Sequence, residues 1–158
     1  MNILVFGHTG QVAMALRALP VPGCRITTLD RRAADLTNPD ACASIIGEQA
    51  PDAVINAAAY TAVNDAESNE ALAHVINADA PAAMALACAA RDIPFFTLST
   101  DYVFSGTGET PWRPDDPTAP QSAYGRTKRA GEIAVQAAGG CSVVLRTSWV
   151  VSAHGTNF

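Results

Sequence analysis

The sequence predicts an α/β fold in which helices cover both faces of a doubly wound parallel sheet. Three observations lead to this prediction. The unbroken apolar run from Ile3 to Phe6 stops at Gly7, as in a strand buried on both faces. Further short apolar runs then alternate with helical stretches along the chain. Small or polar residues follow several of these runs, where the carboxyl ends of parallel strands would meet along one ligand-binding edge.

Composition favours one globular domain over residues 1–158, because 49% of the residues are hydrophobic and 16% are charged. The net charge of −5 argues against a basic surface, so we expect neither nucleic acid nor a membrane as partner. The apolar runs look too short to span a bilayer, and the N-terminus has no signal-peptide pattern. We therefore expect a cytoplasmic protein.

No metal site or disulfide framework is expected from the cysteines and histidines. They are scattered and form no C-x-x-C pair: Cys24, Cys42, Cys88, Cys141, His8, His74 and His154.

The first strand leads into a glycine turn. Gly7, Gly10 and Ala13 have the spacing G-x-x-G-x-x-[GA], which lets a backbone approach a pyrophosphate. A helix from about Gln11 to Leu19 would then direct its N-terminal N–H groups at phosphate. An ordinary strand-to-helix turn is the alternative. The dinucleotide interpretation makes the fold Rossmann-like.

The second strand, Arg25 to Leu29, follows a turn at residues 20–23 and ends in Asp30. An acid about 20 residues beyond the glycine turn can bind the ribose hydroxyls of NAD, whereas Arg31 and Arg32 could pair with the 2′-phosphate of NADP. Cofactor preference stays open, and a solvated turn is the alternative for the arginines.

Two elements follow with clear end signals. Asn38 or Thr37 can cap a helix that has Pro39 in its first turn and runs to about Gln49. The third strand, from 52 to 56, is followed by three alanines, Ala57 to Ala59, that could form the floor of a cofactor cleft.

Residues 62–91 are helical in pattern, and Pro81 predicts a break or a new first turn there, hence two helices with Asn77 or Asp79 near a cap. A fourth strand, 95–98, brings Ser99, Thr100 and Asp101 to the ligand edge. A surface loop spans 105–120, Ser122 caps a helix over 123–138, and a fifth strand spans 142–146.

Tyr124 and Lys128 are four residues apart, so on a helix they share one face. A neighbouring ammonium would lower the pKa of the phenol and make Tyr124 usable as a proton donor. Thr100, or Ser99 as the alternative, would supply a hydroxyl to the substrate carbonyl. Alone, Y-x-x-x-K is more often an exposed polar face; here it converges with the glycine turn on one sheet edge.

Taken together, the motifs resemble the extended short-chain dehydrogenase/reductase superfamily, and within it the reductases of dTDP-linked keto-sugars. The matching segments are FGHTGQV (6–12), DLTNP (35–39), NAAAYTAV (56–63), STDYVF (99–104), YGRTK (124–128) and RTSWV (146–150).

The resemblance implies an NAD(P)-binding Rossmann domain that transfers hydride from NADPH or NADH to the C4 ketone of dTDP-6-deoxy-L-lyxo-4-hexulose, a dTDP-keto-deoxysugar. The implied catalytic set is Thr100, Tyr124 and Lys128. The implied cofactor residues are Gly7, Thr9, Gly10, Gln11, Val12, Asp30, Arg31, Asp35, Leu36, Ala57, Ala58 and Tyr60. The implied substrate residues are Ser99, Thr100, Tyr102, Val103 and Trp149.

The chain departs from the family pattern at two points. Ala15 stands where members commonly have a glutamate that some use in a metal-linked dimer, so no metal is expected and a homodimer stays open. Members are also about twice as long, which suggests an N-terminal fragment, lacking the sugar-nucleotide domain and the last part of the sheet, with little turnover alone.

Two alternatives remain. The regulatory β subunit of methionine adenosyltransferase resembles these reductases and is a binding partner, not a catalyst; retention of Thr100, Tyr124 and Lys128 favours an enzyme. Another reductase or epimerase of the superfamily, acting on a different nucleotide sugar, is the second alternative.

Overall fold

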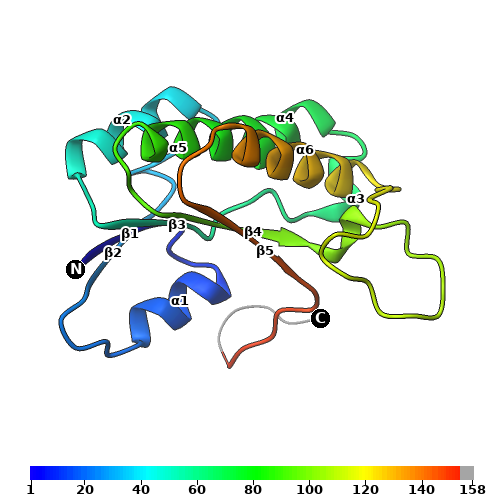
Figure 1. Ribbon diagram of the computed structural model, residues 1–158, viewed down its shortest axis with the longest axis horizontal. Coiled ribbons are helices and arrows are strands. Elements are labelled where there is room, and N and C mark those ends of the chain that lie inside the picture. The colour runs from blue at the N-terminus through cyan, green and yellow to red at the C-terminus, as the bar shows by residue number, and fades with distance from the viewer. Residues whose placement is uncertain (154–158) are drawn as a thin grey trace.

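A computed structural model describes residues 1–153, and it contains a parallel five-stranded sheet (Figure 1). The strand order is β2-β1-β3-β4-β5, which confirms the predicted doubly wound topology. The strands are β1 Asn2–Phe6, β2 Arg25–Leu29, β3 Ala53–Asn56, β4 Phe95–Thr100 and β5 Ser142–Thr147. The chain leaves β1 toward β2 on one side and later returns to β3 on the other. This reversal opens a crevice at the carboxyl ends of β1 and β3, where sheets of this kind bind ligands.

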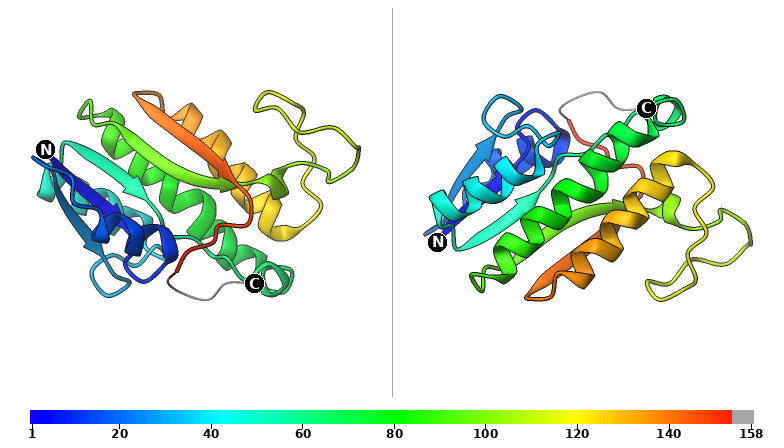
Figure 2. Two further views of the ribbon diagram at one scale, coloured as in Figure 1. Left: turned by 90° about the horizontal axis from the view of Figure 1, so that it is seen from below. Right: turned by 90° about the horizontal axis from the view of Figure 1, so that it is seen from above.

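The two faces of the sheet are covered unequally. Among the described helices, α1 (Gln11–Ala18) alone covers one face, while α2 (Pro39–Gln49), α5 (Ala80–Ala89) and α6 (Ala123–Ala137) form a layer on the other (Figures 1 and 2). The main core lies between the sheet and this layer, and its largest fully buried apolar side chains are Phe6, Ile46, Val54, Met84, Phe95 and Val135.

Local sequence signals explain the helix ends. Asn38, and not Thr37, caps α2, because its side-chain oxygen accepts a hydrogen bond from the Ala41 N–H at 3.1 Å. Ser122 caps α6 in the same way by accepting from the Gly125 N–H at 3.1 Å. Both helices therefore begin where the sequence predicts.

The stretch expected to hold two helices is different. Helix α3 (Val63–Ala66) and helix α4 (Glu70–His74) are separate, but a π-helical turn, η1 (Val75–Asp79), joins α4 to α5 without a break. The predicted break at Pro81 is wrong, whereas the alternative, a new first turn, agrees with the structure, because Pro81 lies in the first turn of α5 and Asp79 is the N-cap residue of that helix. Proline lacks the N–H that would bond to the Asn77 carbonyl. The helix accommodates the missing hydrogen bond with one wider turn, in which the Ala80 N–H donates to the carbonyl of Val75.

The continuous helix Glu70–Ala89 is long and apolar enough to cross a membrane by length and composition, which corrects the expectation that every apolar stretch is too short. Half of its 18-residue apolar window is buried inside the protein, and its α5 part packs against α2 and α6. A core helix passes the same test of length and composition.

Candidate active site

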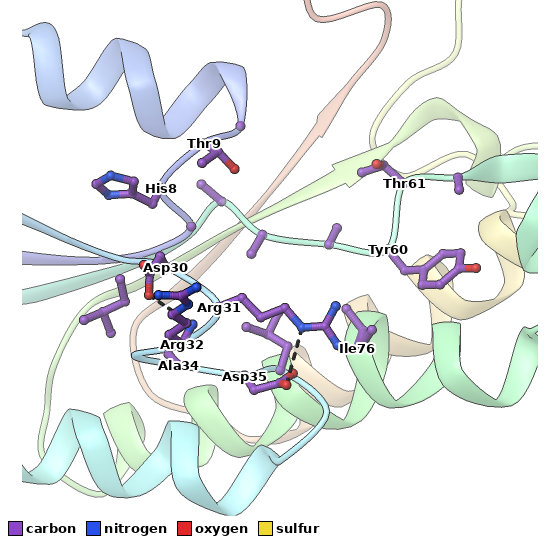
Figure 3. Close-up of a pocket in the computed structure, with 18 residues that line it drawn as sticks. His8, Thr9, Asp30, Arg31, Arg32, Ala34, Asp35, Tyr60, Thr61 and Ile76 are labelled. Carbon is purple, nitrogen blue, oxygen red and sulfur yellow. Dashed lines mark hydrogen bonds and ion pairs between the residues drawn. The ribbon is translucent and has the colours of Figure 1, made fainter. Parts of the chain in front are cut away.

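A pocket of about 700 Å³ occupies the crevice between the ends of β1, β2 and β3 (Figure 3). Every predicted cofactor residue lines it except Gln11 and Val12, which lie in the first turn of α1. The lining residues are Gly7, His8, Thr9, Gly10, Leu29, Asp30, Arg31, Arg32, Ala34, Asp35, Leu36, Ala57, Ala58, Ala59, Tyr60, Thr61, Ala62 and Ile76.

One side of this pocket is formed by backbone. Gly7 has a φ of 118°, and a Cβ at this position would lie 3.2 Å from the carbonyl carbon of Ala57. Gly10 is the N-cap residue of α1, where no side chain caps the helix and no acid lies in its first turn. Uncapped N–H groups at a helix N-terminus favour a phosphate group. The residues therefore fit the pyrophosphate of a dinucleotide.

The opposite side carries charge. One Asp30 carboxylate oxygen accepts hydrogen bonds from the N–H groups of Ala33 (2.9 Å) and Arg32 (3.0 Å). These bonds lower the pKa of Asp30, and the bond from Ala33 has the larger effect. The Arg31 guanidinium lies 3.4 Å from an Asp35 oxygen (Figure 3). The pocket thus offers both an acid and two guanidinium groups at the ribose end, which suits either NAD or NADP.

His8 also lines this pocket, although no sequence motif predicts a role for it. Its Nδ1 atom forms a 2.8 Å hydrogen bond with the Thr28 hydroxyl on the neighbouring strand β2. Its place directly after Gly7 is the one signal that could have identified it.

Helix α6 places Tyr124 and Lys128 beside the end of β4. The Ala123 N–H donates to a Glu67 carboxylate oxygen at 2.7 Å, so a distant acid helps to fix the first turn of the helix. A Cβ at Gly125 would overlap the Tyr102 carbonyl oxygen, so only glycine lets α6 lie directly against η2, the short helix Asp101–Val103. The rings of Tyr102 and Tyr124 then meet edge to face, with centroids 5.8 Å apart.

The predicted effect of Lys128 on the phenol is wrong in this structure, because the pKa of Tyr124 is raised. Burial is the main cause, and Asp101 and Tyr102 act in the same direction, while the nearby Thr100 hydroxyl opposes them. Lys128 donates instead to the Leu98 carbonyl at 2.7 Å, and burial lowers its own pKa to about 8. Sequence spacing places two groups on one helix face, but it does not show which partner each one contacts.

The predicted substrate residues separate into two groups. Tyr102 and Trp149 are 44% and 68% exposed, whereas Ser99 and Val103 are buried. Ser99 lines a small internal cavity of about 10 Å³ with Lys128 and Glu132, on the helix-covered side of β4. Ser99 and Val103 are buried in this structure, their assignment as substrate residues stays a prediction, and Thr100 is the hydroxyl that lies beside Tyr124.

Asn77, in the π-helical turn, links the pocket to α6. Its side-chain oxygen accepts from the Tyr60 N–H at 2.9 Å, and its amide nitrogen donates to the Tyr60 carbonyl at 3.2 Å and to the Thr127 hydroxyl at 3.1 Å. A Cβ at Gly131 would overlap the Asn77 carbonyl oxygen, so α6 approaches this turn closely. The sequence presented Asn77 only as a candidate cap.

A buried ion cluster is centred on α6, one turn after the predicted catalytic residue Lys128. Glu132 is 2% exposed and contacts Arg146 at 2.7 Å and Arg129 at 2.9 Å. Arg146 also donates to the Pro114 carbonyl, and Arg129 donates to the Thr118 hydroxyl. The cluster therefore attaches the loop over 105–120 to α6 and β5. Among the described residues, no group of three His, Cys, Asp or Glu side chains could hold a metal ion.

Comparison with known proteins gives consistent results. The family described as RmlD substrate binding domain matches residues 1–158. A dTDP-4-dehydrorhamnose reductase of Sinorhizobium fredii is 45% identical over 158 residues, all of this chain and 53% of that protein. A Streptomyces antibioticus protein, named probable dTDP-4,6-dihydroxy-2-methyloxan-3-one 4-ketoreductase, is 43% identical over 160 residues, which cover all of this chain and 54% of that protein.

A solved structure shows the same arrangement. The dTDP-4-dehydrorhamnose reductase of Bacillus anthracis, crystallised in complex with NADP, superposes with a TM-score of 0.93 at 32% identity. The match covers 99% of this chain and 56% of that one. The chain thus spans about half the length of the relatives it matches.

Proposed function

Because the chain belongs to the RmlD substrate binding domain family, we propose that it forms the cofactor-binding and proton-donating part of an NAD(P)H-dependent reductase. The proposed reaction reduces the C4 ketone of dTDP-4-dehydro-L-rhamnose, also named dTDP-6-deoxy-L-lyxo-4-hexulose, to the alcohol of dTDP-L-rhamnose. The proposal draws on what the names of the relatives state and on the residues present here.

One observation supports this proposal most strongly. Tyr60, at the end of the pocket, and Tyr124, on α6, pack against the same small cluster of Ala66, Ala73 and Ala123. The dinucleotide pocket and the phenol are thus neighbours along one edge of the sheet, as a hydride donor and a proton donor must be.

A bound NAD(P)H would supply the hydride to the ketone carbon. The turn at Gly7 and Gly10 would hold its pyrophosphate, and Asp30 with Arg31 or Arg32 would hold the adenosine ribose. The oxygen of the ketone must gain one proton when its carbon gains hydride. Tyr124 is the proposed donor, and its raised pKa keeps the phenol protonated at neutral pH.

Lys128 has a supporting role in this scheme. Its pKa of about 8 leaves the ammonium mostly charged at pH 7, and it donates to the Leu98 carbonyl on β4. Through this bond Lys128 would hold the end of β4, which carries Thr100, against the helix that carries Tyr124.

The test measures NADPH and NADH oxidation with dTDP-4-dehydrorhamnose, using the full-length product of the gene. Tyr124→Phe should lower kcat roughly 10²–10⁴-fold, the usual contribution of a positioned acid. Its affinity for NADPH should stay the same, because Tyr124 does not line the pocket. Wild-type turnover by Tyr124→Phe would refute the assignment of the proton donor.

A second candidate substrate is supported by the Streptomyces antibioticus relative, whose name specifies a different dTDP-linked keto-sugar. Parallel assays with both sugars decide between them through the ratio of their kcat/KM values. A non-catalytic regulator would bind NADPH and reduce neither sugar.

A further inference from the structure

Asp101 connects two segments beside the proposed active site. It follows Thr100 directly, at the end of β4, and starts the short helix η2. One of its carboxylate oxygens accepts from the Thr100 hydroxyl at 3.1 Å, and the other accepts from the Ser148 hydroxyl at 2.7 Å. Ser148 lies one residue beyond β5, so this carboxylate joins the two strands past the point where their pairing ends.

The contact determines how the Thr100 hydroxyl is oriented. A threonine hydroxyl has one hydrogen to donate, and here it points to Asp101. The same oxygen accepts from the Tyr102 N–H at 3.2 Å. Two partners therefore hold the side chain in one orientation, and one lone pair of the hydroxyl is left for the neighbouring phenol of Tyr124.

We infer that Asp101 is a positioning residue, which orients the Thr100 hydroxyl with one carboxylate oxygen and ties the segment bearing Ser148 and Trp149 to it with the other. The inference rests on the proposed function for the meaning of Tyr124 as the proton donor. It adds a residue to which the sequence motifs gave no role. It also gives the exposed Trp149 a fixed attachment to the site through its neighbour Ser148.

The charge of Asp101 has a second effect, on Tyr124. The groups that act on the phenol are Thr100 from β4 and Asp101 and Tyr102 from η2, and the alanines of α3 and α4 packed there are uncharged. Asp101 is the one carboxylate among them, and a nearby negative charge opposes ionisation of a phenol. A protonated phenol is the form that can donate to a ketone oxygen.

The experiment separates the contacts from the charge with three variants of the full-length protein. Asp101→Ala removes both contacts, Asp101→Asn removes the charge while keeping the shape, and Ser148→Ala removes one contact and keeps the charge. Asp115→Asn, in the exposed loop, controls for a general change in net charge. The readouts are the titration of ¹³Cζ-labelled tyrosine, the coupling that reports the Thr100 χ1 angle, and amide hydrogen exchange.

Asp101→Ala should average the Thr100 χ1 angle and speed amide exchange at residues 148–150. Asp101→Asn should lower the pKa of Tyr124, because it removes a negative charge that opposes ionisation of the phenol. Ser148→Ala should speed exchange at 148–150 and leave the Tyr124 titration unchanged, as should Asp115→Asn.

The inference is overturned if Asp101→Ala leaves the Thr100 coupling and the exchange unchanged, or if Asp101→Asn leaves the Tyr124 titration unchanged. NADPH affinity, measured on the same samples, should equal that of the wild type, because Asp101 does not line the pocket. Loss of the proposed function would appear as absent NADPH binding or turnover, and the spectroscopic readouts would still decide the role of Asp101.

Discussion

The proposed cofactor side and the proposed catalytic side of this site, here called the cofactor side and the catalytic side, have different compositions. The cofactor side consists largely of backbone and small residues, such as Gly7, Gly10 and Ala57, which leave room for a ligand. The catalytic side consists of polar side chains that bond to one another, such as Glu132 with its two arginines. The cofactor side is open because its side chains are small or absent, whereas the catalytic side depends on specific contacts between polar side chains. Changes on the first should weaken binding, and changes on the second should weaken the fold.

The largest effect is expected for Glu132→Ala. This change leaves Arg146 and Arg129 without their buried carboxylate, and breaking a buried pair in this way costs about 3–5 kcal/mol of unfolding free energy. Urea unfolding measures it. Glu109→Ala, in the exposed loop, is the matched control and should change stability by no more than about 0.5 kcal/mol. A cost for Glu132→Ala as small as that of the control would show that the catalytic side does not depend on this cluster.

An effect of intermediate size is expected for Lys128→Met. The difference in unfolding free energy between wild type and this variant should change as the pH rises. The folded pKa of Lys128 is about 8, below the ordinary 10.5, so the unfolded chain holds this proton more tightly. Burying the charge is a cost at pH values below 8, and it is relieved between about 8 and 10.5. Wild type should therefore gain on the order of 3 kcal/mol of stability relative to Lys128→Met across this window. Denaturant unfolding at several pH values measures the difference, and parallel curves for the two proteins would contradict it.

The smallest effect is expected for Gly10→Ala, which should weaken NADPH binding and leave stability unchanged. A Cβ there would lie 3.9 Å from the Ala57 carbonyl oxygen, an ordinary contact, and the backbone φ of −70° suits alanine. The thermal midpoint should hold, while the added methyl group intrudes on the pyrophosphate position and lowers NADPH affinity by roughly tenfold, or about 1.4 kcal/mol. Gly7→Ala should lower both the thermal midpoint and the affinity for NADPH, because a φ of 118° strains alanine. Equal NADPH affinity in Gly10→Ala and wild type would remove the pyrophosphate from this turn.

The same contrast explains what the sequence could predict. The strands, the glycine turn and the caps of α2 and α6 follow from residues close together in the chain, so their patterns can be read directly. All but two of the predicted cofactor residues line the pocket for the same reason. Small residues leave a recognisable spacing.

The catalytic side was harder to predict because its contacts join distant segments. Asn77 bonds to Thr127 across 50 residues, and Glu67 bonds to Ala123 across 56. No local sequence pattern predicts contacts between residues so far apart. The pKa of Tyr124 was predicted in the wrong direction because burial, which dominates it, depends on the packing of α3, α4 and η2 around the ring.

The π-helical turn ahead of Pro81 has a consequence for how one long helix meets two partners. An added residue rotates everything beyond it by about 100° around the helix axis. Glu70, before the turn, bonds to Arg126 on α6, while Met84, after it, points into the core above the sheet. Shortening η1 by one residue would rotate Glu70 relative to Met84 around the helix axis. The helix could then keep either the contact of Glu70 with Arg126 or the packing of Met84 in the core, and not both.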